Sequence, residues 1–155
     1  MSSVGNVYGL LFNARSIVNQ LSELHYLLYC TNLDIFVITE TWLHVDIMSS
    51  LLDPKGLFTV LRRDRALLRG GGVCVLVRKP LRVIGIDLGN EFDDLEMICF
   101  DLILTGNHTR FLHCIGHLAM IVMLFVTCVS LLNVSLDSKI LNTPVLSLVI
   151  LIFPR

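Results

Sequence analysis

Hydrophobic positions near the start of the chain follow a strand pattern and then a helix pattern. A short apolar run from Val7 to Phe12 ends at Asn13. From Ser16 to Tyr29 the apolar residues recur mostly three or four positions apart, which is the spacing of one helix face. A second apolar run covers Ile35 to Thr39. This order predicts two parallel strands joined by a right-handed helical crossover.

After a loop around Asp53, apolar runs follow one another without helical patterns between them. They cover Phe58 to Leu61, Val73 to Val77, Arg82 to Ile86 and Leu95 to Leu104. Strands without intervening helices favour antiparallel pairing, so we expect a meander added to the same sheet. The first hundred residues therefore predict an α/β fold.

The last third of the chain is much more hydrophobic than the rest. Hydrophobic residues make up 54% of the chain, which is high for a soluble domain. The excess lies late in the sequence, because residues Phe111 to Leu136 contain no Asp, Glu, Lys or Arg. Residues 118–136 have the length of a helix that spans a membrane. One interpretation is a single-span membrane protein with a soluble N-terminal module.

Neither the cysteines nor the N-terminus indicates export. The chain has 5 cysteines and no C-x-x-C pair, which argues against a disulfide framework and a zinc site. The opening residues, MSSVGNVYG, lack the basic and long apolar regions of a secretory signal. We therefore expect an intracellular protein, nuclear or cytoplasmic, with membrane association through 118–136 as the alternative.

Charge indicates a nucleic-acid partner only locally. The net charge of -1 provides no global basic field. A basic loop, RRDRALLR, precedes three glycines at residues 70–72, and such a loop can hold phosphates or can be a solvated hairpin. A nucleic-acid-binding module without catalysis would use Arg63 and Arg65 for salt-sensitive contacts.

Two oxygen-bearing side chains follow the two predicted parallel strands. Asn13 comes after the first strand and Glu40 after the second. Parallel strands end at the same edge of a sheet, where α/β proteins bind ligands. Amide and carboxylate oxygens suit Mg²⁺, although an asparagine in a turn and a solvated glutamate explain the same positions.

Three segments, LLFNARSIVNQLSELHYLL, DIFVITETWL and LRRDRALLRGGGVCVLVRK, stand out together. In this order they resemble the endonuclease/exonuclease/phosphatase family, most closely the endonuclease domain of LINE-type (non-LTR) retrotransposons. The resemblance covers residues 7 to about 114. It implies a two-layer α/β sandwich that hydrolyses DNA phosphodiesters with Mg²⁺. Asn13 and Glu40 match the metal-site residues of the family, and Arg63 and Arg65 lie in a loop that can contact DNA.

The later motifs of the family, a YRPP-like segment, GDFN and SDH, are absent from the chain. However, permitted codons for CIGHLAMIVM, residues 114–123, spell YRPPGYDSD when they are read one base earlier. The same shift turns LVILIFP, residues 148–154, into GDFNFP. We infer the loss of one base near Cys114, which also explains the apolar tail.

The sequence thus predicts a truncated two-layer α/β sandwich with an apolar C-terminal tail. Residues 1–114 form a partial endonuclease domain, and residues 115–155 are read out of frame. We expect a magnesium-binding DNA endonuclease fragment that is inactive as translated. The single-span membrane protein remains the alternative.

Overall fold

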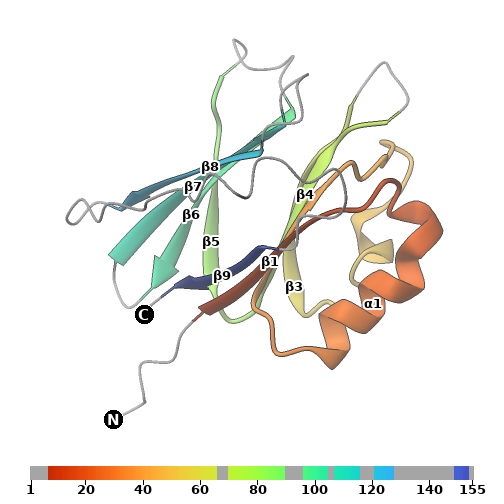
Figure 1. The fold of residues 1–155 in the computed structure, drawn as a ribbon, viewed down its shortest axis with the longest axis horizontal. Helices are drawn as coiled ribbons and strands as arrows, with labels where there is room; N and C mark the ends of the chain where they lie inside the picture. Colours follow the sequence, from red (N-terminus) through yellow and green to blue (C-terminus); the bar gives the residue numbers. More distant parts are fainter. Residues whose placement is uncertain are drawn as a thin grey trace.

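The structure, a computed structural model, describes residues 7–65, 70–89, 96–104, 107–115, 121–127 and 149–153, with side chains up to residue 103. These residues form two sheets, with a helix beside the first (Figure 1). The first sheet has the order β3-β4-β2-β1-β9 and the second the order β5-β6-β7-β8. The first sheet contains β1 Val7–Asn13, β2 Ile35–Thr39, β3 Phe58–Arg63, β4 Val73–Arg78 and β9 Val149–Phe153. The second sheet contains β5 Arg82–Ile86, β6 Glu96–Leu104, β7 Asn107–Ile115 and β8 Ile121–Thr127. The described residues are therefore a mixed α/β fold, as the sequence predicted.

The predicted strand–helix–strand unit is present. β1 and β2 pair in parallel, from Gly9 opposite Ile35 to Asn13 opposite Thr39. The connection contains the 3₁₀ turn η1, Val18–Gln20, and the helix α1, Leu21–Cys30. The helical segment begins later than the predicted Ser16, because Ser16 has a φ of 88°, which is outside the helical region.

Side chains of the first sheet alternate between two hydrophobic clusters. In β4, Val73, Val75 and Val77 belong to one cluster, whereas Cys74 and Leu76 belong to the other. This alternation is the two-residue period of a strand that is buried on both faces.

Each cluster joins the first sheet to a different layer. One contains Ile98, Phe100 and Leu102 of β6, so the second sheet covers that face. The other cluster contains Leu24 and Leu28 of α1, so the helix covers the opposite face of the first sheet. Burying a side chain of this size contributes roughly 1.5–3 kcal/mol. The parallel unit is thus held between the helix and the second sheet.

The meander prediction was only partly correct. β3 and β4 do add to the first sheet by antiparallel pairing. In contrast, β5 pairs with β6 and begins a second sheet. The physical reason is that β4 is apolar on both faces, so its second face needs a covering layer rather than another neighbouring strand.

The apolar late segment forms strands where the structure describes it. Within the predicted span 118–136, residues Ile121–Thr127 are strand β8, and the other residues of that span lie outside the described part. β8 pairs with β7, and β9 pairs antiparallel with β1. In the described part of the chain, no helix has both the length and the apolar character to cross a membrane.

Candidate metal site at the ends of β1 and β2

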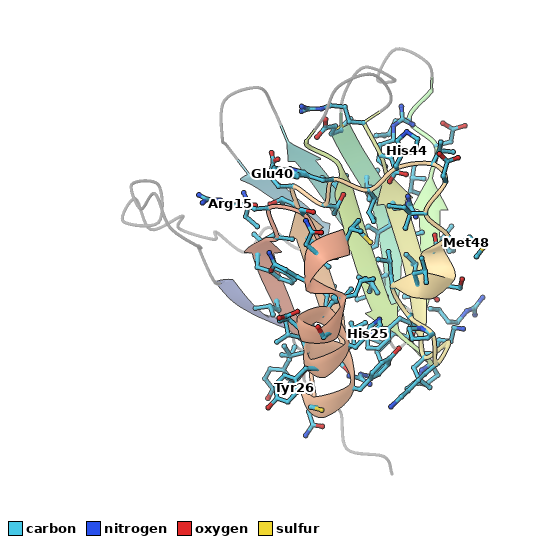
Figure 2. The ribbon with its side chains drawn as sticks, turned by 90° about the vertical axis from the view of Figure 1, so that its right-hand side faces the viewer. Arg15, His25, Tyr26, Glu40, His44 and Met48 are labelled. Carbon is cyan, nitrogen blue, oxygen red and sulfur yellow. The ribbon has the colours of Figure 1, made fainter. Side chains whose placement is uncertain are left out.

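Asn13 and Glu40 leave neighbouring parallel strands at the same edge. Asn13 is the last residue of β1 and lies opposite Thr39, the last residue of β2, so Glu40 is the next residue along. Figure 2 shows Glu40 and Arg15 at the same end of the molecule, away from Tyr26. The shared edge that the sequence predicted is therefore present in the structure.

The loop after β1 continues the pairing with the loop after β2. The backbone N–H of Ser16 donates to the carbonyl of Glu40 at 2.9 Å, and that of Ile17 donates to Thr41, also at 2.9 Å. These bonds extend the parallel ladder beyond both strands. The position of Glu40 is consequently set by its neighbours in space as well as by β2.

A third loop, the glycine segment before β4, hydrogen-bonds the other side of residues 40–42. The N–H of Thr41 donates to the carbonyl of Gly72 at 3.2 Å, and the N–H of Trp42 donates to Gly71 at 2.9 Å. Both glycines have positive φ, 73° for Gly71 and 81° for Gly72, which only glycine adopts without strain. The loop after β2 thus lies between the other two loops.

The site concentrates unfavourable backbone conformations. Among the described residues that are not glycine, positive φ occurs at Arg15 (44°), Ser16 (88°), Glu40 (52°) and Trp42 (52°), and all of them lie in these loops. Each such residue costs about 1–2 kcal/mol. Strain of this kind gathers at functional sites, where the surrounding structure maintains it.

Two donors orient the carboxylate of Glu40. Its Oε2 accepts from the indole Nε1 of Trp42 at 2.9 Å and from the N–H of Gly71 at 3.0 Å. No described residue hydrogen-bonds the second oxygen, Oε1. The half-buried carboxylate is therefore held through Oε2, and its Oε1 is available to a ligand.

Asn13 uses its side chain in a local turn. Its Oδ1 accepts from the N–H of Arg15 at 3.1 Å. A carbonyl oxygen has two lone pairs, so this bond leaves a position for a second partner. The half-buried amide is compatible with both interpretations of the residue, a turn former and a weak oxygen ligand.

A second glutamate, Glu96, contacts the same glycine segment and was not singled out from the sequence. Its Oε2 accepts from the N–H of Gly72 at 2.7 Å, and its Oε1 pairs with Nε of Arg65. Glu96 is the first residue of β6 and is only 9% exposed. An acidic residue at the start of a strand carries no sequence signal of such a role.

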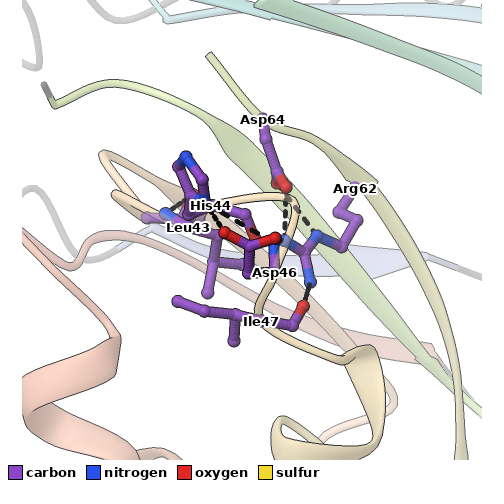
Figure 3. Close-up of polar contacts among 7 residues, drawn as sticks. Leu43, His44, Asp46, Ile47, Arg62 and Asp64 are labelled. Atoms are coloured by element: carbon purple, nitrogen blue, oxygen red, sulfur yellow. Dashed lines mark hydrogen bonds and ion pairs between the residues drawn. The ribbon is translucent and has the colours of Figure 1, made fainter. Parts of the chain in front are cut away.

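The predicted basic loop begins later than expected, because Arg62 and Arg63 are the last residues of β3, and its described arginines are engaged in intramolecular contacts. Arg65 pairs with Glu96, and Arg63 also has interactions within the protein. Arg62 pairs with Asp64 and donates to the carbonyl of Ile47 at 2.6 Å (Figure 3). The predicted DNA contact by Arg63 and Arg65 stays a prediction, and it would have to compete with these contacts.

One histidine–aspartate pair is found among the described side chains. Nδ1 of His44 lies 2.9 Å from Oδ2 of Asp46, and their side chains are 63% and 85% exposed. An aspartate that orients a catalytic histidine is usually buried and held by further bonds. His44 and Asp46 are not buried as a catalytic histidine–aspartate pair usually is.

The two oxygen-bearing side chains at this edge, of Asn13 and Glu40, are of the types that bind Mg²⁺. Within the described part, no three His, Cys, Asp or Glu side chains gather in a group that could hold a metal. Mg²⁺ commonly uses one or two carboxylates and keeps several waters. Glu40, with Asn13 as the second oxygen donor, is consistent with such a site.

Neither a protein-family model nor a curated protein matches the chain.

Proposed function

We propose that residues 1–114 are the metal-binding half of a magnesium-dependent DNA endonuclease, of the endonuclease/exonuclease/phosphatase type and of retrotransposon origin. We further propose that the chain in this reading frame does not cleave DNA. The observation that supports the proposal most is that Asn13 ends β1 and Glu40 directly follows β2, its parallel neighbour, with the Glu40 carboxylate held by two donors.

Glu40 has the features of a prepared metal ligand. Its Oε2 is held by Trp42 and Gly71, so little side-chain freedom is left to lose when Oε1 binds a cation. A bound magnesium would polarise a phosphodiester and stabilise the departing oxygen. Asn13 would contribute an oxygen from the adjacent strand, and water and phosphate would complete the coordination.

The proposed inactivity follows from the groups that are absent. In the described part, His44 and Asp46 are exposed and offer no buried base to activate water. The GDFN and SDH motifs do not occur in the printed sequence. Catalytic groups that act as a unit lose most of their effect when one is removed, so a metal ligand alone gives little cleavage.

The test is nicking of supercoiled plasmid DNA in Mg²⁺. The chain should show no more nicking than its Glu40→Gln variant. One inserted base near codon 114 should restore the YRPP and GDFN segments but not SDH, so the restored chain is not expected to nick DNA either. Robust nicking by the original chain that is lost in Glu40→Gln would contradict the inactivity. A nucleotide sequence that cannot spell the motifs after Cys114 would contradict the frame shift.

A further inference from the structure

Glu96 is held at both of its carboxylate oxygens. Its Oε2 accepts from the N–H of Gly72 at 2.7 Å, and its Oε1 pairs with Nε of Arg65. The residue is 9% exposed. A buried carboxylate with a backbone donor and a guanidinium partner is satisfied, so it has no need of a ligand of its own.

The neighbouring amide, that of Gly71, binds the other glutamate. Gly71 N–H donates to Oε2 of Glu40 at 3.0 Å. Two consecutive amides thus bind two carboxylates, and these carboxylates come from different sheets. Glu40 follows β2 of the first sheet, and Glu96 begins β6 of the second.

The glycine segment has little room in which to move. A Cβ on Gly71 would lie 2.5 Å from Cζ of Arg65 and 2.5 Å from Oε1 of Glu96. A Cβ on Gly72 would lie 2.6 Å from Oγ1 of Thr41. The Arg65–Glu96 pair therefore packs directly against the backbone that carries the donor to Glu40.

We propose that Glu96 is a positioning residue for Glu40 and acts through the backbone of Gly71 and Gly72. By holding the amide of Gly72, Glu96 sets the direction of the preceding amide and hence the orientation of the Glu40 carboxylate. The value of this orientation for metal binding rests on the function proposed above. The positioning itself is a property of the protein without metal.

The chain contains its own reporter of this arrangement. Trp42 is the only tryptophan, and its Nε1 donates to the same oxygen of Glu40 at 2.9 Å. A change in the orientation of Glu40 therefore alters the surroundings of the indole. Tryptophan emission of the metal-free chain reports the positioning, and Mn²⁺ binding followed by electron paramagnetic resonance reports its consequence.

The experiment compares Glu96→Ala with Asp53→Ala. Asp53 is a matched control, because it is 6% exposed and accepts from the N–H of Phe58 at 2.7 Å and from the hydroxyl of Tyr29 at 2.7 Å. Glu96→Ala should change the Trp42 emission and weaken Mn²⁺ binding by about 10- to 100-fold. Asp53→Ala should leave both unchanged relative to the parent chain wherever circular dichroism shows a folded protein.

Glu96→Gln keeps one acceptor oxygen for Gly72, removes the charge that pairs with Arg65, and replaces the oxygen that accepts from Arg65 with an NH2 group. It should bind Mn²⁺ better than Glu96→Ala and change the emission less, and it serves in place of Glu96→Ala if that variant does not fold. Trp42 emission that is the same in the parent chain and in both Glu96 variants would overturn the positioning role. Absence of Mn²⁺ binding in the parent chain would instead refute the proposed metal site, and the emission comparison would still decide the role of Glu96.

Discussion

Trp42 donates a hydrogen bond from its indole Nε1 to Oε2 of Glu40, two residues earlier, at 2.9 Å. Both residues have a φ of 52°, which non-glycine residues adopt only when other contacts maintain it. The bond links Glu40, which we propose as a metal ligand, to a ring that is 37% exposed. An exposed tryptophan in a strained conformation is thus explained by the carboxylate that it orients.

The first prediction removes this bond. Trp42→Phe keeps an aromatic ring but loses the Nε1 donor, which leaves Glu40 held only by Gly71. Mn²⁺ binding, measured by electron paramagnetic resonance, should weaken about tenfold. Tyr26→Phe, at a 66% exposed position of α1, is the control and should bind as the parent chain does. Equal binding by Trp42→Phe and the parent chain would show that the indole does not support the ligand.

The second prediction concerns backbone strain. Arg15 is exposed and has a φ of 44°, so Arg15→Gly removes an unfavourable conformation. Its free energy of unfolding in urea should equal that of the parent chain or exceed it by up to about 1 kcal/mol. Tyr26→Gly, in the middle of α1, should instead lower it by about 1 kcal/mol. If Arg15→Gly lowers the free energy of unfolding as much as Tyr26→Gly does, the positive φ of Arg15 carries no energetic cost and the prediction is wrong.

The third prediction concerns the end of α1. Nη2 of Arg78 donates to the carbonyl of Leu28 at 2.9 Å and to that of Thr31 at 3.1 Å, and Nε donates to Leu33 at 2.9 Å. The carbonyls of Leu28 and Thr31 lie at the C-terminal end of α1, where a cation is favourable, and that of Leu33 lies between α1 and β2. Arg78→Lys cannot reproduce the guanidinium geometry. It should lower the free energy of unfolding by about 2 kcal/mol.

The matched control for Arg78→Lys is Arg82→Lys, because Arg82 is an exposed residue of β5. This substitution should change the stability by less than about 0.5 kcal/mol. Urea unfolding followed by circular dichroism measures both variants. Indistinguishable curves for the two would mean that Arg78 does not stabilise the helix end.

The fourth prediction concerns alkaline pH. Burial raises the pKa of the Cys74 thiol from 9.0 to about 12. The folded state therefore retains this proton when the unfolded state loses it. The stability that this group contributes is complete below pH 9 and is lost as the pH rises towards 12. Between these values the stability of the parent chain should fall more steeply with pH than that of Cys74→Ala.

Thiol labelling gives an independent check of the burial of Cys74. At pH 8 the exposed Cys30 should react with iodoacetamide while Cys74 stays unlabelled, and mass spectrometry of the peptides distinguishes them. Equal labelling of the two cysteines in the folded chain would contradict the buried environment of Cys74.

The parallel unit and its edge could be predicted from the sequence. The run Ile35–Thr39 has the bounds predicted for it, because five buried residues between polar ones leave little choice of strand. Once two parallel strands are expected, the positions of Asn13 and Glu40 follow from strand direction alone. Local pattern was sufficient there.

The contacts of Glu96 could not be predicted in this way. Its partners Gly72 and Arg65 lie 24 and 31 residues away in the sequence, and they meet only when the second sheet packs on the first. The division into two sheets had the same cause, because a strand pattern shows which face is apolar but not which layer covers it. Tertiary packing determined both features.

The most direct test of the account is Mn²⁺ binding to the parent chain and to Glu40→Gln, measured by electron paramagnetic resonance. Circular dichroism first establishes that the two chains are equally folded. The glutamine keeps the shape and the hydrogen-bond acceptor of the side chain but not its charge. The account predicts one bound Mn²⁺ in the parent chain and at least tenfold weaker binding in Glu40→Gln. Equal binding by the two chains, or none by either, would contradict it.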